Sequence, residues 1–291
     1  MSRFAHFVAI DWSGAVGSFQ RGIAVAICHA GRTAPWLIAP PGRYWSRINV
    51  LTWLTSALPA DTLIGFDLGP ALPFTDQDAY FPGWNKSPAN ARALWALVEN
   101  ICADEPHLGA TRFVDHPTAS AHFRRHGGRT GAAFGTGRGR LRVTELAQQV
   151  QGLRPYSNFN LVGAAQVGKS SLTGMRLLHQ LGERLPVWPF DPVGASGSAI
   201  VEIYTSLAAM AAGRPRGRTK MRDRAALNAA LAAPAIDSAG VGGDGLIDDH
   251  MSDALLTAAW LRRHADCAPL WQPTSLSSTI ADTEGWTFGV S

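Results

Sequence analysis

The N-terminal part of the chain alternates between short apolar runs and polar turns. Three runs rich in Ile, Val and Ala occupy residues 5–10, 21–30 and 34–41. Turn residues separate them, which favours three consecutive strands in an antiparallel meander. The apolar spacing over 46–58 then predicts an amphipathic helix with Ser46 as its N-cap, and a fourth strand is predicted at 62–66.

The rest of the chain alternates between helical patterns and irregular, Gly- and Pro-containing stretches. One more strand is predicted at 198–204. The helical patterns fall at residues 88–103, 143–152, 171–182, 223–233 and 248–263. We therefore predict an α/β fold with a mixed sheet flanked by helices, in which strands 1–3 are antiparallel and the later strands are parallel.

Composition supports a globular protein with a substantial core. Hydrophobic residues make up 46% of the 291 residues and charged residues only 16%. The formal net charge is +4, which is compatible with a phosphate-bearing partner such as nucleic acid. Three widely separated cysteines favour neither a zinc site nor a disulfide framework. No apolar window reaches the length of a membrane span, so we expect a cytoplasmic protein without membrane contact.

Several acidic residues end apolar strands or lie within them. Asp11 and Asp67 end the first and fourth predicted strands, and Glu202 lies inside the late one. A carboxylate in such surroundings costs free energy unless it is paired or bound to metal. On the last predicted helix, Asp249 and Asp253 are four residues apart and share one face. Converging carboxylates favour a hard divalent cation and the chemistry of phosphoryl esters.

The order of these motifs resembles the ribonuclease-H-like nuclease superfamily. The segment HMSDAL, residues 250–255, resembles the equivalent helix of Holliday-junction resolvases. The series IDWSG, IGFDLGPALPF, VEIY and DDHMSDAL is similar to a family of predicted nucleases called domain of unknown function 429. The resemblance covers roughly residues 5–75 and 195–265. It implies a single domain over 1–291 that contains an insertion at 76–195.

The resemblance also implies a site and an activity. Its catalytic metal ligands map onto Asp11, Asp67, Glu202 and Asp253, with Asp249 as an auxiliary ligand, for Mg²⁺- or Mn²⁺-dependent phosphodiester hydrolysis. The sequence departs from the family in two ways. Several relatives have Glu where this chain has Asp67, and Glu202 contributes only if its side of the strand faces the site.

Each acidic residue also has a structural interpretation. Asp11 and Asp67 precede turn residues and can act as turn caps, and Glu202 can pair with an arginine. Asp249 stands near a helix start, where it stabilises the helix whatever the function. Asp253 is harder to explain in this way because its helix face carries small and apolar residues.

A competing motif lies in the middle of the chain. Residues 163–170, GAAQVGKS, match the phosphate-binding loop pattern G-x-x-x-x-G-K-[ST]. In a P-loop nucleotide-binding protein, Gly163–Ser170 would cradle phosphates and Lys169 would reach them. The motif needs a buried strand before it, and SNFNLV at 157–162 is a poor one. We prefer a loop beside the carboxylates in which Lys169 and Ser170 contact a phosphate.

Two further alternatives stay open. DWSG and DLG resemble the phosphate loops of actin-like kinases and chaperones, although those proteins need two such domains. The chain can also be a binding module that keeps the fold without catalysis. Arginines at 124–142 and 213–224 favour phosphate contact if they flank the carboxylates, with Arg138 as the candidate, and are otherwise solvated in a mobile loop.

Overall fold

A six-stranded mixed sheet forms the centre of the protein. The computed structural model describes residues 3–163, 166–215 and 220–291. The strands lie in the order β3-β2-β1-β4-β6-β5. Their bounds are His6–Asp11 (β1), Ala24–His29 (β2), Trp36–Leu37 (β3), Thr62–Asp67 (β4), Val187–Trp188 (β5) and Ala199–Glu202 (β6).

The strand directions confirm the predicted mixed sheet. β1, β2 and β3 pair antiparallel, whereas β4, β6 and β5 continue the sheet in parallel from β1. The third strand is shorter than the predicted 34–41. Pro35 and Pro40 flank Trp36–Leu37, and proline cannot donate a ladder hydrogen bond. The α/β class and the antiparallel-then-parallel arrangement are therefore correct.

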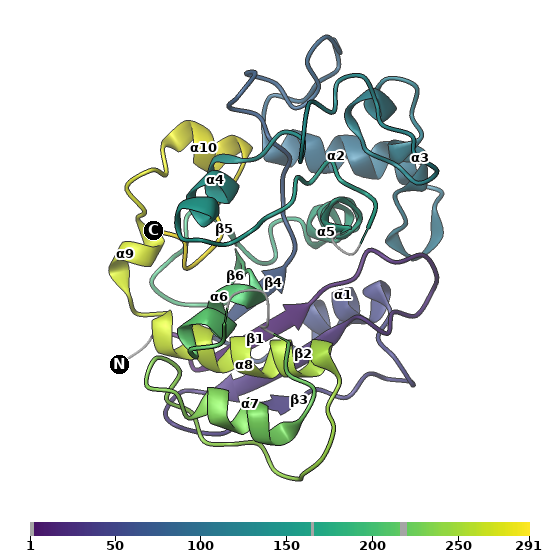
Figure 1. The fold of residues 1–291 in the computed structure, drawn as a ribbon. Coiled ribbons are helices and arrows are strands. Elements are labelled where there is room, and N and C mark those ends of the chain that lie inside the picture. The colour runs from purple at the N-terminus through teal and green to yellow at the C-terminus, as the bar shows by residue number, and fades with distance from the viewer. Residues whose placement is uncertain (1–2, 164–165, 216–219) are drawn as a thin grey trace.

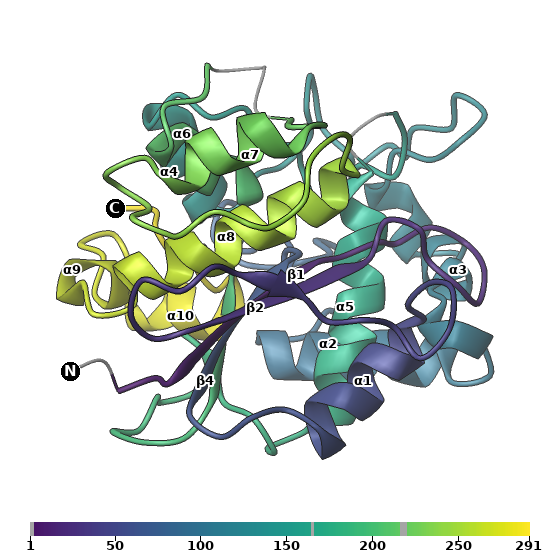
Figure 2. The same cartoon turned by 90° about the horizontal axis from the view of Figure 1, so that it is seen from below.

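Helices cover both faces of the sheet (Figure 2). On one face lie α1 (Arg47–Ser56), α2 (Ala91–Cys102) and α5 (Val167–Leu181). The other face carries α6 (Thr205–Ala211), α7 (Arg224–Leu231) and α8 (Asp249–His264). The remaining short elements are η1 (Pro106–Leu108), α3 (Thr111–Val114), η2 (Ala119–His122), α4 (Val143–Val150), α9 (Ala268–Trp271) and α10 (Ser278–Thr283).

Side-chain alternation along the strands assigns each position to one of two apolar cores. Val8 and Ile10 of β1 enter the core beneath α1, α2 and α5, whereas Phe7 and Ala9 enter the core beneath α8. Alternate residues of a strand point to opposite faces of the sheet. Asp11, the next odd-numbered position, therefore faces α8.

The segment predicted as an insertion, 76–195, contributes to the same core as the first strands. Leu94 of α2 and Leu172 of α5 are fully buried in one cluster with Ile64 of β4. β5 extends the sheet at its edge.

No helix within the described residues is long and apolar enough to span a membrane.

Candidate metal and phosphate site

Two aspartates end neighbouring parallel strands in the same register. Asp11 of β1 is the direct partner of Asp67 of β4 in the ladder. In β4, Ile64 and Phe66 enter the core beneath α5, whereas Leu63 enters the core beneath α8. The alternation therefore directs Asp67 to the same face as Asp11. The two carboxylates lie side by side at the carboxyl edge of the sheet, as the sequence predicted.

Helix α8 brings a third carboxylate to this edge. Asp253 is only 6% exposed, and Ala254 and Ala258 beside it are fully buried against the sheet. Such small residues allow the helix to approach the strands closely. The helix begins with Asp248, whose side chain accepts a hydrogen bond from the backbone N–H of His250. This cap fixes the first turn, which carries Asp249 and His250, and Asp253 follows in the second turn.

Lys220 and His250 are the cationic partners of these carboxylates. The Lys220 Nζ lies 2.7 Å from Asp253 Oδ2 and 3.7 Å from Asp249 Oδ2. His250 Nδ1 lies 3.0 Å from Asp11 Oδ2. Asp67 receives a weaker hydrogen bond, 3.3 Å long, from the Thr205 hydroxyl. Lys220, His250 and Arg222, the last 3.6 Å from Asp249, thus pair with Asp253, Asp249 and Asp11, whereas Asp67 forms no ion pair within the described residues.

Burial removes the carboxylates from water and disfavours their charged forms. Burial raises the pKa of Asp67 well above its usual range, and the charges of Asp11 and Asp253 raise it further. Burial likewise raises the pKa of Asp11, although His250 opposes this, and raises that of Asp253 to about 6 against the effect of Lys220. An excess of buried negative charge is typical of functional sites.

The nearby carboxylates raise the pKa values of both cationic groups, which favours their charged forms. The hydrogen bond with Asp11 raises the pKa of His250, although burial opposes it. Burial lowers the pKa of Lys220, but Asp253, Asp11 and Asp249 outweigh it and leave that pKa raised. For Asp249, burial is outweighed by Lys220, His250 and Arg222, so its pKa is lowered. Asp249 is therefore a solvated ion-pair partner at the rim of the cluster.

These groups line a cavity of about 640 Å³, which we call the carboxylate cavity. Asp67, Asp253, His250 and Lys220 form one part of its wall, whereas Asp11 does not line it and contacts His250, which does. Lys169 and Ser170, in the first turn of α5, line another part. The structure therefore places both predicted phosphate contacts at the same cavity as the aspartates.

Arg138 has a different position from Lys169. It is exposed, donates a 3.2 Å hydrogen bond to the carbonyl of Pro155, and lies over the ring of Tyr156. Pro155 and Tyr156 line the carboxylate cavity, whereas Arg138 does not. Arg138 therefore contacts two residues of the cavity wall without lining the cavity itself. The basic stretch 213–224 delivers Lys220, but its residues 216–219 lie outside the described part of the chain.

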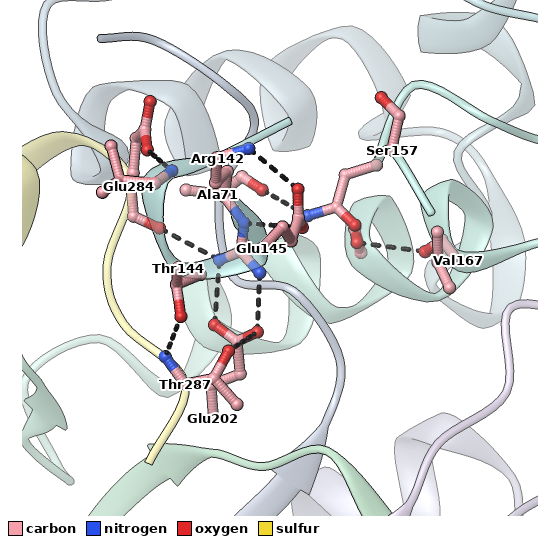
Figure 3. A network of polar contacts seen from close by, with 12 residues as sticks. Ala71, Arg142, Thr144, Glu145, Ser157, Val167, Glu202, Glu284 and Thr287 are labelled. Carbon is pink, nitrogen blue, oxygen red and sulfur yellow. Dashed lines mark hydrogen bonds and ion pairs between the residues drawn. The ribbon is translucent and has the colours of Figure 1, made fainter. Parts of the chain in front are cut away.

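Glu202 lines the carboxylate cavity but is paired with an arginine rather than grouped with the aspartates, as its structural interpretation predicted. It pairs in the ladder with Phe66, and its neighbour Ile200 packs beneath α5, so its side chain leaves the opposite face of the sheet. Arg142 binds both carboxylate oxygens, at 2.6 and 2.8 Å, and the Thr287 hydroxyl donates at 2.8 Å (Figure 3). The next residue, Ile203, enters the core beneath α8, on the face of the sheet that the aspartates share. Glu202 is therefore part of an ion pair.

The ion pair belongs to a buried network that joins distant segments. Arg142, 1% exposed, also donates to Glu145 of α4 at 3.0 Å and to the carbonyl of Glu284 at 3.0 Å (Figure 3). Burial lowers the pKa of Arg142, but Glu202 and Glu145 outweigh it and raise that pKa. The network fixes α4 and the C-terminal segment to β6.

Two arginines of the predicted mobile loop are in fact buried anchors. Arg140 is 7% exposed and binds Asp76 together with three backbone carbonyls. Arg142 holds Glu202. Sequence reasoning missed both because glycines surround them, and the composition of a loop does not reveal which of its cations are paired.

The P-loop pattern lacks the structure that it needs. Helix α5 already begins at Val167, so Gly168, Lys169 and Ser170 form its first turn. Residues 157–162 contain no strand, only an isolated bridge between Asn160 and Arg124. Residues 164–165 of the motif lie outside the described chain. The local fold therefore gives no support to a strand-loop-helix nucleotide cradle.

The remaining candidate cluster is explained by helix capping. In the described residues, Asp248, Asp249 and His250 are three metal-capable side chains whose ligand atoms all lie within 4.8 Å of one another. Asp248 is exposed and is already the N-cap of α8.

Asp11, Asp67 and Asp253 form no such compact trio. An ion among them would bind one or two carboxylates directly and keep water in its other positions, which is typical of magnesium.

Comparison of the chain with models of protein families, with curated proteins and with solved structures gives no match.

Proposed function

We propose that the protein is a divalent-metal-dependent phosphodiesterase of the nuclease type. The observation that carries the proposal is the pairing of Asp11 with Asp67 at the ends of parallel strands, facing Asp253 on α8. These residues supply hard oxygen donors and an excess of negative charge that neither Lys220 nor His250 balances. Mg²⁺ and Mn²⁺ fit such a donor set.

The fold supports the same proposal in a more general way. A ribonuclease-H-like fold is consistent with the strand order β3-β2-β1-β4-β6 and with the antiparallel β2. The resemblance of IDWSG and DDHMSDAL to predicted nucleases adds the expected reaction. Because Glu202 is engaged by Arg142, we assign the metal to Asp11, Asp67 and Asp253, with Asp249 at the rim.

The residues of the cavity divide into three roles. A bound divalent cation would polarise the phosphodiester and lower the pKa of an attacking water. Asp67 in the cavity wall and Asp11 beside it in the sheet would hold the cation. Lys169 and Ser170, on the opposite wall, are placed to bind a substrate phosphate oxygen. His250, hydrogen-bonded to Asp11, is the cavity side chain suited to hold or release a proton near neutral pH.

Metal binding and cleavage test the proposal separately. Mn²⁺ affinity is measured by calorimetry, and cleavage is followed with bis(p-nitrophenyl) phosphate and with fluorescent single- and double-stranded DNA and RNA. Asp11→Asn and Asp67→Asn should each lower Mn²⁺ affinity by tenfold or more and abolish metal-dependent cleavage. Asp244→Asn, at an exposed residue that does not line the cavity, is the matched control and should change neither.

The pattern of results distinguishes the alternatives. Lys169→Ala should weaken cleavage and leave Mn²⁺ affinity intact. Mg²⁺-dependent binding of a nucleoside triphosphate that depends on Lys169, with no metal-dependent cleavage, would favour the P-loop interpretation. Mn²⁺ binding and cleavage that survive both aspartate substitutions would overturn the proposal, and stable binding of a partner with no turnover would favour a binding module.

A further inference from the structure

A second cavity adjoins the carboxylate cavity and shares part of its wall. Its volume is about 400 Å³, within the ~300–1,000 Å³ of small-ligand sites. Gly14, Ala15 and Lys169 line both cavities. The dividing wall is thus the turn after β1 and the first turn of α5. We call this second space the side cavity.

The dividing wall is tightly built. A Cβ atom on Gly14 would lie inside contact distance of the backbone of Lys169 and Ser170, so the turn and the helix touch without a side chain between them. Trp12 strengthens the contact by donating a 3.1 Å hydrogen bond from its ring N–H to Thr173. Lys169 is therefore held at a fixed place between the two cavities.

The body of the side cavity is apolar. Its walls include Val16, Pro106, Ala110, Val114, Leu161 and Leu172. They come from the turn after β1, from η1, from α3 and its N-cap, from the segment before α5, and from α5 itself. A flat organic group fits such walls, because apolar surfaces and a few placed polar groups are typical of ligand sites.

The cavity also collects positive charge. Arg47, Arg125, Arg129 and Lys169 line it, against Glu105 and Asp115. Asp115 pairs with Arg125, and Glu105 accepts from the backbone N–H groups of Thr111 and Arg112. Within the described ranges, no carboxylate forms an ion pair with the other three cations. The surplus of positive charge favours an anion.

Arg47 is the most deeply buried of these cations. It is 2% exposed and donates only to backbone carbonyls, those of His107, Ser13 and Ala15. Burial and the nearby Arg176 lower its pKa to about 10. The Nε of Arg125 is buried without a hydrogen-bond partner. Buried cationic groups without carboxylates lower the free energy of an anionic ligand in this space.

Lys169 and His126 mark the place for the anion. The Lys169 Nζ lies 2.8 Å from the His126 Nε2, where the basic loop meets α5. A phosphate at this point would touch the edge of the carboxylate cavity, because Lys169 lines both spaces. The apolar part of the side cavity begins on the other side of the same lysine.

From this arrangement we infer that the side cavity binds one nucleotide unit, with its base between the apolar walls and its phosphate at Lys169 and His126. The inference rests on the proposed function, because it names the substrate class that the carboxylate cavity would act on. The unit is either a free 5′-mononucleotide or a residue of a single-stranded nucleic acid, since both present the same base and phosphate.

Calorimetric titration of the full chain in EDTA tests the inference without metal or turnover. Adenosine and uridine 5′-monophosphates are the probes, and adenosine, uridine and inorganic phosphate are the comparison ligands. At least one mononucleotide should bind tenfold or more tightly than its nucleoside and than phosphate. A pentaribonucleotide titrated in the same way tells whether the unit is free or part of a chain.

Two variants locate the binding. Lys169→Ala should weaken mononucleotide binding at least tenfold, whereas Lys86→Ala, an exposed lysine outside both cavities, should not change it. Val114→Trp, which fills the apolar part from the half-buried side of α3, should abolish binding while circular dichroism and the melting temperature report an intact fold.

The inference is overturned if neither mononucleotide nor pentanucleotide binds the folded protein, if phosphate alone binds as tightly as the nucleotides, or if binding survives Val114→Trp. Because no metal is present, these results do not depend on Mn²⁺ binding or cleavage. Failure of the metal proposal would leave nucleotide binding in EDTA unchanged, so the two failures are distinguishable.

Discussion

Asp11 and Asp67 are direct ladder partners at the ends of two parallel strands, and both face helix α8. Like charges in this position destabilise the fold, and burial increases the cost. Structural carboxylates in the same protein, such as Glu202, are instead matched with an arginine. Among the side chains that the structure describes, Asp11 has only His250 as a partner, and Asp67 only the Thr205 hydroxyl, which supports the proposal that the pair serves binding.

Removal of Lys220 should strengthen metal binding. Its ammonium lies 2.7 Å from Asp253, where it supplies the positive charge of the metal-free site. Lys220→Met removes that competition and leaves the carboxylates intact, so Mn²⁺ affinity should rise about tenfold, or about 1.4 kcal/mol. Thermal unfolding in EDTA should show a less stable protein. Weaker Mn²⁺ binding by this variant would show that the lysine assists the ion instead.

Glu202 should prove structural rather than metal-binding. Glu202→Gln leaves Arg142 with Glu145 as a partner and should destabilise the protein by about 2 kcal/mol in urea unfolding. Arg142→Met leaves both glutamates buried without their cation and should cost about 3–5 kcal/mol. Mn²⁺ affinity of Glu202→Gln should match that of the unaltered protein. A tenfold loss of affinity would return Glu202 to the metal site.

The same network should make stability depend on pH through Glu145. Burial raises the pKa of Glu145 to about 7 despite Arg142, against about 4.3 in an unfolded chain. The stability that comes from this raised pKa is fully present below about pH 4.3 and is lost as pH rises through about 7. Between pH 5 and 8 the free energy of unfolding of the protein should therefore fall by about 2 kcal/mol more than that of Glu145→Gln does.

Urea unfolding of both proteins in EDTA provides the comparison. The other titrating groups are common to the pair, so they cancel in the difference between the two pH profiles. Parallel profiles would show that Glu145 stays ionised in the folded protein over this range.

Gly14 should be intolerant of a side chain. A methyl group there would collide with the backbone of Lys169 and Ser170, and overpacking of this kind costs about 1–3 kcal/mol. Gly14→Ala should lower the melting temperature and reduce cleavage, because the wall between the two cavities must open. Gly42→Ala, whose added Cβ meets no atom within 4 Å, is the matched control. Equal melting temperatures for the two variants would contradict the close contact.

Local pattern was sufficient to predict five of the six strands and the places of Asp11, Asp67 and Asp253, but not β5. Apolar runs ended by Asp11 and Asp67 place those residues at strand ends, and the small-residue face around Asp253 predicts close helix packing. These features are encoded over a few residues. The strand order then brings them together, because β1 and β4 are neighbours in a parallel pair.

The position of Glu202 required long-range information. Its side of β6 depends on a register that a four-residue strand does not reveal, and its partner Arg142 is 60 residues away in a glycine-rich stretch. Helix α5 begins four residues earlier than predicted because Gly168 packs against the backbone of Asn158 and Asn160, a contact between segments. The side cavity likewise draws on α1, η1, α3, α5 and the loops between them, and has no local signature.

A structure of the protein with bound Mn²⁺, located by its anomalous scattering, tests the central claim most directly. The account predicts an Mn²⁺ ion bound by oxygens of Asp11 and Asp67, with Asp253 on its far side and with Glu202 still bound to Arg142. An ion found only at Asp248, Asp249 and His250 on the surface of α8, or no ion at saturating Mn²⁺, would contradict it.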